Sequence, residues 1–444
     1  MSRVAFLHAC GPAARALMLY AALVTTACQE AVQARSFPGT STGAEPHSPT
    51  ACVVREAGRE RLLLEDGRPV YVEPTVVQAN SRGDILLAGT PNYVWTRSRA
   101  GTGEYQSEDY SIFGVVLPLK GSPRTVESPV DPRLVGGVRA VAHEDGTWGV
   151  VFAEIRPWTR YPPPDTATRL WYGVYDGRAW RSLEQLPLPA GGRLRSDFVS
   201  ALVKKADTLA WAMVMDGPEG RSDVVVFERA RGRWSYDIVP AHNAVYVALA
   251  HSNASGLSLA VVQPDQALPD DTNSLFLWGR DPTWRVLRKV VPGGREPVHH
   301  PILTRTSTGD VLSWWVVTQD LGGSRYEARA MIGGRRTHDP RVVTIDDNIA
   351  EALVSITPPG GMHLWVTDHI LSADRREIRF IRNSASGAVV LGRIQNPFTG
   401  GFGATTLAHP DLLIAGPLLN QSSIGPVVTT LLLRARVQCR GSAL

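Results

Sequence analysis

The sequence predicts an all-β fold in which similar four-stranded sheets close into a ring, the architecture of a β-propeller. Short runs rich in Val, Trp and Tyr alternate with turns of Gly, Pro and Asp, and these runs recur with a regular period. The 444 residues include 41 Gly, 32 Pro and 12 Trp, and 43% are hydrophobic. Such a composition suits a packed chain with many turns. No segment keeps a helical period for more than a few residues.

Residues 1–27 have the pattern of a signal peptide with a lipobox-like end. Arginines precede the apolar run Ala16–Ala27, whose 12 residues fall short of the roughly 20 needed to span a bilayer. Val24–Cys28 resembles a bacterial lipobox, with Thr25 in place of the usual Leu. We expect lipidation at Cys28, and cleavage after Ala34 with simple secretion is the alternative.

Residues 28–50 are expected to form a flexible tether, and residues 51–444 a single propeller domain. The tether is rich in Ser, Thr, Gly and Pro and has little to bury. By resemblance to known lipoproteins, Gln29 after the lipidated cysteine implies an outer membrane. The expected location is therefore the bacterial cell envelope, as an outer-membrane lipoprotein or a secreted protein, with membrane contact through the lipid anchor alone.

Two of the four cysteines belong to the folded domain. Cys10 lies in the signal peptide and Cys28 is either lipidated or removed, which leaves Cys52 and Cys439 in an oxidising compartment. We expect these two to form a disulfide, and two separate buried thiols are the alternative. The closed loop would span nearly the whole domain, for which chain entropy gives an upper bound of roughly 5–6 kcal/mol.

The repeat predicts the number of blades. Trp180, Trp234 and Trp284 each follow a hairpin turn, at intervals of roughly 50 to 54 residues, a period typical of propeller blades. The first strands of successive units are expected to begin near Thr75, Val135, Phe198, Ala244, Val298, Ile349 and Phe402. These starts predict seven blades, with six as the alternative.

The two ends of the chain are expected to share one blade. The last unit, which ends with Val427–Cys439, has only three obvious strands, so Cys52–Glu56 is expected to supply the fourth. Closure by strands from both termini removes two sheet edges that would otherwise invite aggregation. The expected Cys52–Cys439 bond would lock this junction.

The blades resemble those of the sialidase superfamily and of other propellers with bacterial neuraminidase repeats. The resemblance lies in Leu170–Trp180 and its counterparts Val224–Trp234 and Leu275–Trp284. It implies the propeller fold and a sialidase-like hydrolase activity. The aspartate box Ser-x-Asp-x-Gly-x-Thr-Trp is not intact, although His143–Trp148 keeps Asp-Gly-Thr-Trp, and Ile155–Pro157 scrambles the Arg-Ile-Pro signature.

The predicted ligand face is the one formed by the connections that enter the first strands and by those between the second and third strands. Trp and Tyr beside Arg can stack on a sugar ring while guanidinium groups bind a carboxylate or hydroxyls. The candidate ligand-binding residues on this face are Trp158, Arg160, Tyr161, Arg133, Arg195, His242 and His299. Solvated arginines and aromatics that merely cover the blades are the alternative.

Catalytic residues are only weakly indicated. Sialidases use Tyr as the nucleophile with a carboxylate partner. Tyr246, Asp197 and Glu351 lie near first strands and are the candidates here. The prediction favours a non-catalytic module that binds a glycan or an envelope protein, and a divergent sialidase-like exo-glycoside hydrolase is the alternative.

Metal, cofactor and nucleic-acid functions are not expected. Adjacent residues of an extended strand point to opposite sides, so His299 and His300 are predicted to divide between the channel and the core. The acidic loop Asp265–Asn273 does not match the twelve-residue calcium loop. There is no phosphate loop or Gly-x-Ser-x-Gly motif, and the net charge is only +4, without a long basic run.

Overall fold

The computed structural model describes most of the chain after residue 51. The described residues are 52–89, 92–97, 105–109, 112–154, 169–194, 200–205, 207–217, 221–252, 256–264, 273–280, 282–291, 298–306, 309–320, 323–332, 341–357, 362–372, 374–384, 387–407, 411–422 and 425–439. Among these residues there is no α-helix, and the helix η1 (Pro132–Leu134) is a single 3-10 turn. No helix in this part of the chain is long and apolar enough to cross a membrane.

The strands form antiparallel sheets that follow one another along the chain. The first four blades consist of β3 (Val76–Ala79), β4 (Ile85–Ala88), β7 (Ile112–Leu117) and β8 (Arg124–Glu127); β9 (Val135–Ala142), β10 (Trp148–Glu154), β11 (Arg169–Tyr175) and β12 (Trp180–Gln185); β13 (Arg193–Leu194), β14 (Ser200–Lys205), β15 (Thr208–Asp216), β16 (Ser222–Ala230) and β17 (Arg233–Val239); and β18 (Tyr246–Ser252), β19 (Gly256–Pro264), β20 (Asn273–Arg280) and β21 (Trp284–Val291).

The long strand β25 joins the next two blades, and the termini build the last one. These blades consist of β22 (Val298–Thr306), β23 (Gly309–Asp320), β24 (Gly323–Ile332) and the first half of β25 (Arg341–Ile356); the second half of β25 with β26 (Leu364–Ser372), β27 (Arg375–Ser384) and β28 (Gly387–Gln395); and β29 (Gly403–Thr406), β30 (Asp411–Ser422), β31 (Gly425–Cys439) and β1 (Cys52–Arg61).

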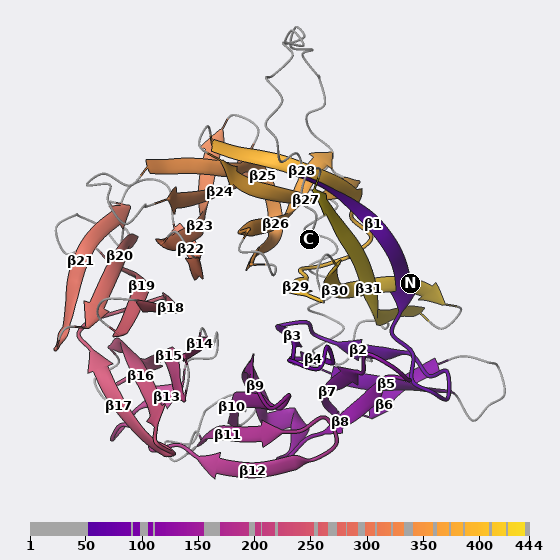
Figure 1. The fold of residues 1–444 in the computed structure, drawn as a ribbon, viewed down its shortest axis with the longest axis horizontal. Helices are drawn as coiled ribbons and strands as arrows, with labels where there is room; N and C mark the ends of the chain where they lie inside the picture. Colours follow the sequence, from indigo (N-terminus) through magenta and orange to yellow (C-terminus); the bar gives the residue numbers. More distant parts are fainter. Residues whose placement is uncertain are drawn as a thin grey trace, which may run out of the picture.

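The inner strands close a ring around a central axis (Figure 1). Each contacts the next, in the order β3, β9, β14, β18, β22, β25 and β29, and β29 contacts β3 again. The described strands therefore confirm the all-β propeller, and their arrangement is compatible with the seven blades expected from the repeat. A small additional sheet of β2 (Val70–Val72), β5 (Asn92–Arg97) and β6 (Tyr105–Asp109) was not expected from the sequence.

The hydrophobic core lies between the blades. Each apolar cluster combines the facing sides of two neighbouring blades, and one such cluster lies at every junction around the ring. The middle strands are covered on both sides, so β10 is buried from Trp148 through Ala153 and reads as an almost continuous apolar run. The strong burial of β15, with Trp211 fully covered, has the same cause.

Two of the repeated tryptophans, Trp180 and Trp234, pack against aromatic residues of the preceding blade. Trp180, at the start of the outermost strand of its blade, packs edge-on against Phe113 of the preceding blade, with ring centroids 5.2 Å apart. Its indole N–H donates to the carbonyl of Glu127 at 3.0 Å. Trp234 makes the equivalent contact with Tyr172, at 5.4 Å. The period found in the sequence therefore reflects how blades pack on one another.

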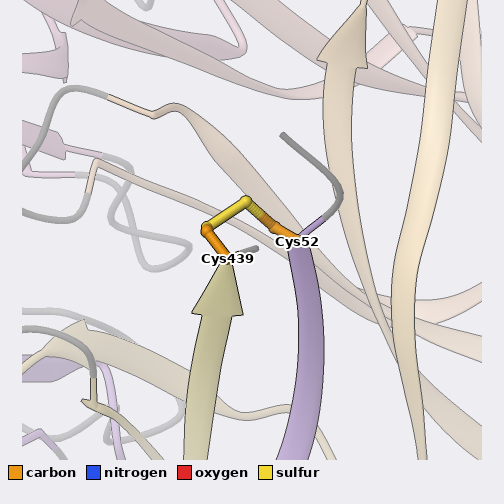
Figure 2. The surroundings of a disulfide bond; sticks show 2 residues. All are labelled: Cys52 and Cys439. Carbon is orange, nitrogen blue, oxygen red and sulfur yellow. A yellow bond between two sulfur atoms is a disulfide. The ribbon is translucent and has the colours of Figure 1, made fainter. Parts of the chain in front are cut away.

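The seam between the termini has the expected form. β1 pairs with β31, and Cys52 stands opposite Cys439 in the register. A disulfide joins the two cysteines across a sequence separation of 387 residues, and Figure 2 shows this bond at the paired ends of the two strands. The predicted disulfide and the predicted closure by both termini are confirmed.

Candidate functional site

The central space of the ring contains a cavity of about 960 Å³. Its wall comes from the inner strands and the residues just before them, together with Trp315 of β23 and Tyr326 of β24. The lining residues with polar or aromatic side chains are Thr75, Arg139, His299, His300, Trp315, Tyr326, Ser355 and Phe402. The other lining residues are Ala, Val, Leu, Ile and Pro, so the cavity combines an apolar wall with a few polar groups, as ligand sites commonly do.

A β-bulge in β22 shapes one side of this wall. His299 pairs with Trp315 and Ile302 pairs with Ser313, so that His300 and Pro301 together stand opposite the single residue between them on β23. Proline has no N–H for the ladder, which favours a bulge at this point. His300 has a φ of 44°, a left-handed conformation that costs a non-glycine residue roughly 1–3 kcal/mol.

The bulge brings both imidazoles to the cavity. The rings of His299 and His300 are nearly parallel, with centroids 6.4 Å apart and planes at 30°, and both residues line the cavity. The expectation that adjacent histidines point to opposite sides is therefore wrong here. It assumed a regular extended strand, and the bulge breaks the alternation of side chains.

An aromatic stack extends outward from the two histidines. His300 lies between Tyr246 of β18 and Trp315 of β23, with ring centroids 4.6 and 4.7 Å away. Trp315 meets Tyr326 of β24 edge-on at 6.3 Å. The Trp315 indole N–H is buried and has no hydrogen-bond partner among the described residues. Three consecutive strands of one blade and the neighbouring β18 thus converge on one patch, which we call the aromatic wall: Tyr246, His299, His300, Trp315 and Tyr326.

A hydrogen bond connects two members of the aromatic wall. The Tyr246 hydroxyl lies 3.3 Å from Nδ1 of His299, and the direction of donation depends on the imidazole tautomer. Burial lowers the pKa of His299. Burial also lowers the pKa of His300, and the nearby His299 charge lowers it further. The wall therefore favours two neutral imidazoles near pH 7.

Arg139 of β9 lies on another part of the cavity wall. It also borders a smaller hollow of about 430 Å³, whose lining includes Glu73 and Gln78. One guanidinium N–H donates to the carbonyl of Val138 at 2.7 Å. Burial lowers the pKa of Arg139 to about 10, so the side chain keeps its charge at neutral pH. The carboxylate of Glu73 accepts a hydrogen bond from the Tyr71 hydroxyl.

A chain of hydroxyls and an imidazole borders the cavity between the fifth and sixth blades. The Ser355 hydroxyl lies 2.6 Å from Nε2 of His363 and 2.6 Å from the Thr304 hydroxyl. Nδ1 of His363 is buried without a partner among the described residues. A buried nitrogen lone pair without a partner costs less free energy than a buried N–H without one. Nδ1 of His363 is therefore the unprotonated nitrogen, and Nε2 carries the proton and donates a hydrogen bond to the Ser355 hydroxyl. His363 therefore orients this serine and does not activate it as a nucleophile.

One group of side chains has the composition of a metal site. Asp346, Asp347 and His369 offer ligand atoms within 4.8 Å of one another. Protein donors already occupy Asp346, because His369 Nδ1 lies 2.7 Å from Oδ1 and the Thr367 hydroxyl donates to Oδ2 at 2.6 Å. Arg379 adds a contact of 3.4 Å to Oδ1. The arrangement is that of a buried polar network that links β25 to β26 and β27 of the sixth blade.

The structure brings only two of the candidate site residues predicted from the sequence together. Tyr246 and His299 come together in the aromatic wall. His242 lies on the connection into β18 and pairs with Asp223 at 2.9 Å, and it is not among the residues that line the cavity. Arg133 belongs to η1 and Glu351 to β25, but their side chains lie outside the described part of the chain. The remaining candidates, Cys28, Trp158, Arg160, Tyr161, Arg195 and Asp197, lie outside the described residues.

Sequence reasoning did not identify Trp315, Tyr326 and Arg139 as wall residues, and for His299 and His300 it expected only one of the two at the channel. It searched the connections between strands, whereas these side chains come from the strands themselves. The one signal available was Pro301, because a proline inside a predicted strand indicates a bulge. A bulge beside two histidines would have pointed to the wall.

Comparisons with known proteins add information on the fold. No family model matches the chain, and no curated protein matches it. Among solved structures, the polysaccharide lyase Uly1 has a TM-score of 0.50 at 11% identity, with 82% of this chain and 90% of that chain covered. The GH93 α-L-arabinofuranosidase of Fusarium graminearum has a TM-score of 0.46 at 14% identity, covering 68% and 93%.

The sialidase of Trypanosoma rangeli has a TM-score of 0.38 at 12% identity, and the match covers 81% of this chain and 59% of the sialidase chain. At these identities a likeness concerns the fold alone. Together with the closed ring of sheets, the likeness to the lyase confirms the propeller fold expected from the blade pattern. The chain is a β-propeller.

Proposed function

We propose that the protein is an exported, envelope-tethered propeller that binds a glycan in its central cavity. The observation that carries the proposal is the bulge in β22, which gathers His299 and His300 with Trp315 on the cavity wall. Flat aromatic and imidazole faces suit the apolar faces of sugar rings, while ring nitrogens and hydroxyls suit their hydroxyl groups. The cavity volume also lies within the range of roughly 300–1,000 Å³ common for small-ligand sites.

The fold supports a carbohydrate as the ligand class. A polysaccharide lyase has a similar fold, and we carry the ligand class of that protein over to this chain. We propose binding without turnover, because none of the described residues that line the larger cavity is Asp or Glu. Glycoside hydrolysis commonly needs a pair of carboxyl groups or a Tyr with a carboxylate partner. An envelope protein is the alternative partner.

A glycan array with the purified protein tests the proposal. We expect His299→Ala to weaken binding of any retained glycan by about tenfold or more, because an edge of the aromatic wall is lost. The matched control is His242→Ala, which changes a histidine outside the cavity lining and leaves binding unchanged. If the intact protein retains no glycan, or if both variants bind like the wild type, the proposed site is rejected.

Catalysis on the bound glycan is a second candidate, favoured by the Tyr246–His299 hydrogen bond. A tyrosine paired with a neutral imidazole can pass a proton in either direction, which is the basis of general acid–base catalysis. The sialidase-like hydrolase expected as an alternative from the sequence would use Tyr246 as a nucleophile. A panel of fluorogenic glycosides separates binding from turnover: hydrolysis that Tyr246→Phe abolishes would establish an enzyme, and its absence would support the binding module.

We also propose that Cys28 carries the lipid anchor. The apolar run Ala16–Ala27 and the lipobox-like residues before Cys28 support this assignment. Metabolic labelling with a palmitate analogue tests it, with Cys28→Ser as the control. Label that depends on Cys28 supports the anchor, whereas an unlabelled protein that begins after Ala34 would support simple secretion.

A further inference from the structure

The two imidazoles of the aromatic wall are held together more rigidly than two histidines on a regular strand. Pro301 and the left-handed backbone at His300 fix the bulge, and Tyr246 and Trp315 cover His300 from two sides. The rings of His299 and His300 therefore stay about as close as the observed 6.4 Å. Two protonated imidazoles at this separation repel each other, and neither can easily turn away.

The neighbours of the pair supply no negative charge among the described residues. β18 contributes the Tyr246 hydroxyl, β23 the Trp315 indole and β24 the Tyr326 ring. Across the cavity, β9 contributes the positive Arg139. The smaller hollow beside the cavity includes the carboxylate of Glu73, which is engaged by the Tyr71 hydroxyl.

We propose that protonation of the His299–His300 pair regulates the glycan site, so that the protein binds its ligand when both imidazoles are neutral and releases it when they are protonated. This inference rests on the proposed function, because it concerns the same cavity.

Protonation should weaken binding because a bound sugar removes water from the two imidazoles. In the free protein, the cavity keeps both imidazoles in contact with solvent, which can hydrate a proton charge. A sugar ring stacked on the wall displaces that water, and the described neighbours offer no carboxylate in its place. The pKa of each histidine, already lowered by burial, then falls further in the complex. Binding therefore releases protons, and acid weakens it.

Calorimetric titration of the wild-type protein with a neutral oligosaccharide taken from the array measures this coupling. Below the histidine pKa values, linkage predicts that affinity falls by about tenfold per pH unit for one linked proton and by up to about a hundredfold for two. Titrations at one pH in buffers of different ionisation enthalpy count the protons released. We expect a count near zero above pH 7.5, where both imidazoles are neutral, and a count that rises toward two as the pH falls below the histidine pKa values.

Two variants assign the protons to the pair. His299→Gln keeps a polar side chain without a titrating group, and His300→Asn suits the left-handed backbone at that position. Each is expected to reduce the number of protons released per bound saccharide by about one, a count that does not depend on how much affinity the variant keeps. His242→Gln, outside the cavity lining, is the control and should keep the wild-type pH profile.

The outcomes separate the two proposals. Binding that is constant between pH 7.5 and pH 5, or that tightens in acid, overturns the inference but leaves the glycan site standing. Binding that weakens in acid equally in the wild type and in both variants also overturns it. If no glycan binds at any pH, the proposed function itself fails. The proton count of the wild type decides the question even if one variant does not fold.

Discussion

Two junctions between blades use tryptophan in different ways. At the junction of the first and second blades, Trp148 and Trp180 are packed in an apolar cluster, and each indole N–H donates to a backbone carbonyl at 3.0 Å. At the junction of the fifth and sixth blades, Trp315 and Trp365 are also buried, but neither N–H has a partner among the described residues. There the His363 ring also meets the Trp365 ring in a T-shaped arrangement, with centroids 4.7 Å apart.

Tryptophan N–H groups without a partner among the described residues also occur at other junctions, so what distinguishes the second junction is the bulge at His300 and Pro301 and its place beside the cavity. The first junction obeys the usual rules of packing and hydrogen bonding. The second contains a bulge, a residue with positive φ and unsatisfied polar atoms, and it borders the larger cavity. Local departures from those rules gather where a protein has a function, and so the second junction is where we place the ligand.

The largest expected effect concerns the stable junction. Trp148 is fully buried, so Trp148→Ala should lower the free energy of unfolding by about 3–5 kcal/mol through lost burial and the cavity left behind. Denaturant unfolding measures the change, with the exposed Leu119→Ala as a control near zero. Glycan binding at a temperature where the variant is folded should not change. A loss below 1 kcal/mol would remove the contrast between the junctions.

The buried network around Asp346 should be nearly as sensitive. Burial alone would raise the pKa of Asp346, but hydrogen bonds from His369 and Thr367 and the charge of Arg379 lower it. Asp346→Ala leaves these donors buried without their acceptor and should cost about 3 kcal/mol. The exposed Asp347→Ala is the matched control and should change stability by no more than about 0.5 kcal/mol. Stability that falls on chelator treatment, in the wild type but not in Asp346→Ala, would instead indicate a bound metal.

Acid should weaken the second junction through His363. Burial lowers the pKa of His363 from its ordinary value of 6.5 to about 4, so the unfolded chain binds a proton in the interval where the folded chain does not. This contribution to stability is complete above pH 6.5 and is lost as the pH falls toward 4, by up to about 3 kcal/mol. His363→Phe should flatten the pH dependence of unfolding in that interval. Ser355→Ala keeps the buried imidazole and should retain the slope, and equal slopes in all three proteins would contradict the account.

The smallest expected effect has the opposite sign. Asn tolerates the left-handed conformation better than His, so His300→Asn should raise the free energy of unfolding by roughly 0.5–1 kcal/mol. Thermal unfolding under conditions where the wild type is reversible measures the gain. His242→Asn is the control, because it makes the same change of side chain at a residue without a positive φ, and it should not raise the free energy of unfolding. Destabilisation by His300→Asn would mean that the bulge is not strained.

The sequence was sufficient for the fold because its signals are local and repeated. Each of the seven predicted starts, from Thr75 to Phe402, lies within about two residues of the beginning of an inner strand or, for Ile349, of the second half of β25. The closing pair Cys52 and Cys439 followed from the two thiols left in the domain. The short strands β2 and β6 were missed, because three to five residues carry too little pattern.

The site was only partly predictable. Tyr246 and His299 were found, because they lie where connections enter the inner strands. Their partners could not be found in the same way, since Trp315 and Tyr326 belong to later strands of the blade and reach the wall only through the register of the sheet. The common orientation of His299 and His300 depends on one bulge, and a regular strand would have separated them.

The most direct test of the account is to locate a bound saccharide. A crystal structure of the protein with the tightest-binding glycan from the array should place a sugar ring in the central cavity, in contact with His299, His300 or Trp315. A sugar bound at the outer edge of a blade or on the opposite face of the ring, with the aromatic wall empty, would contradict the account.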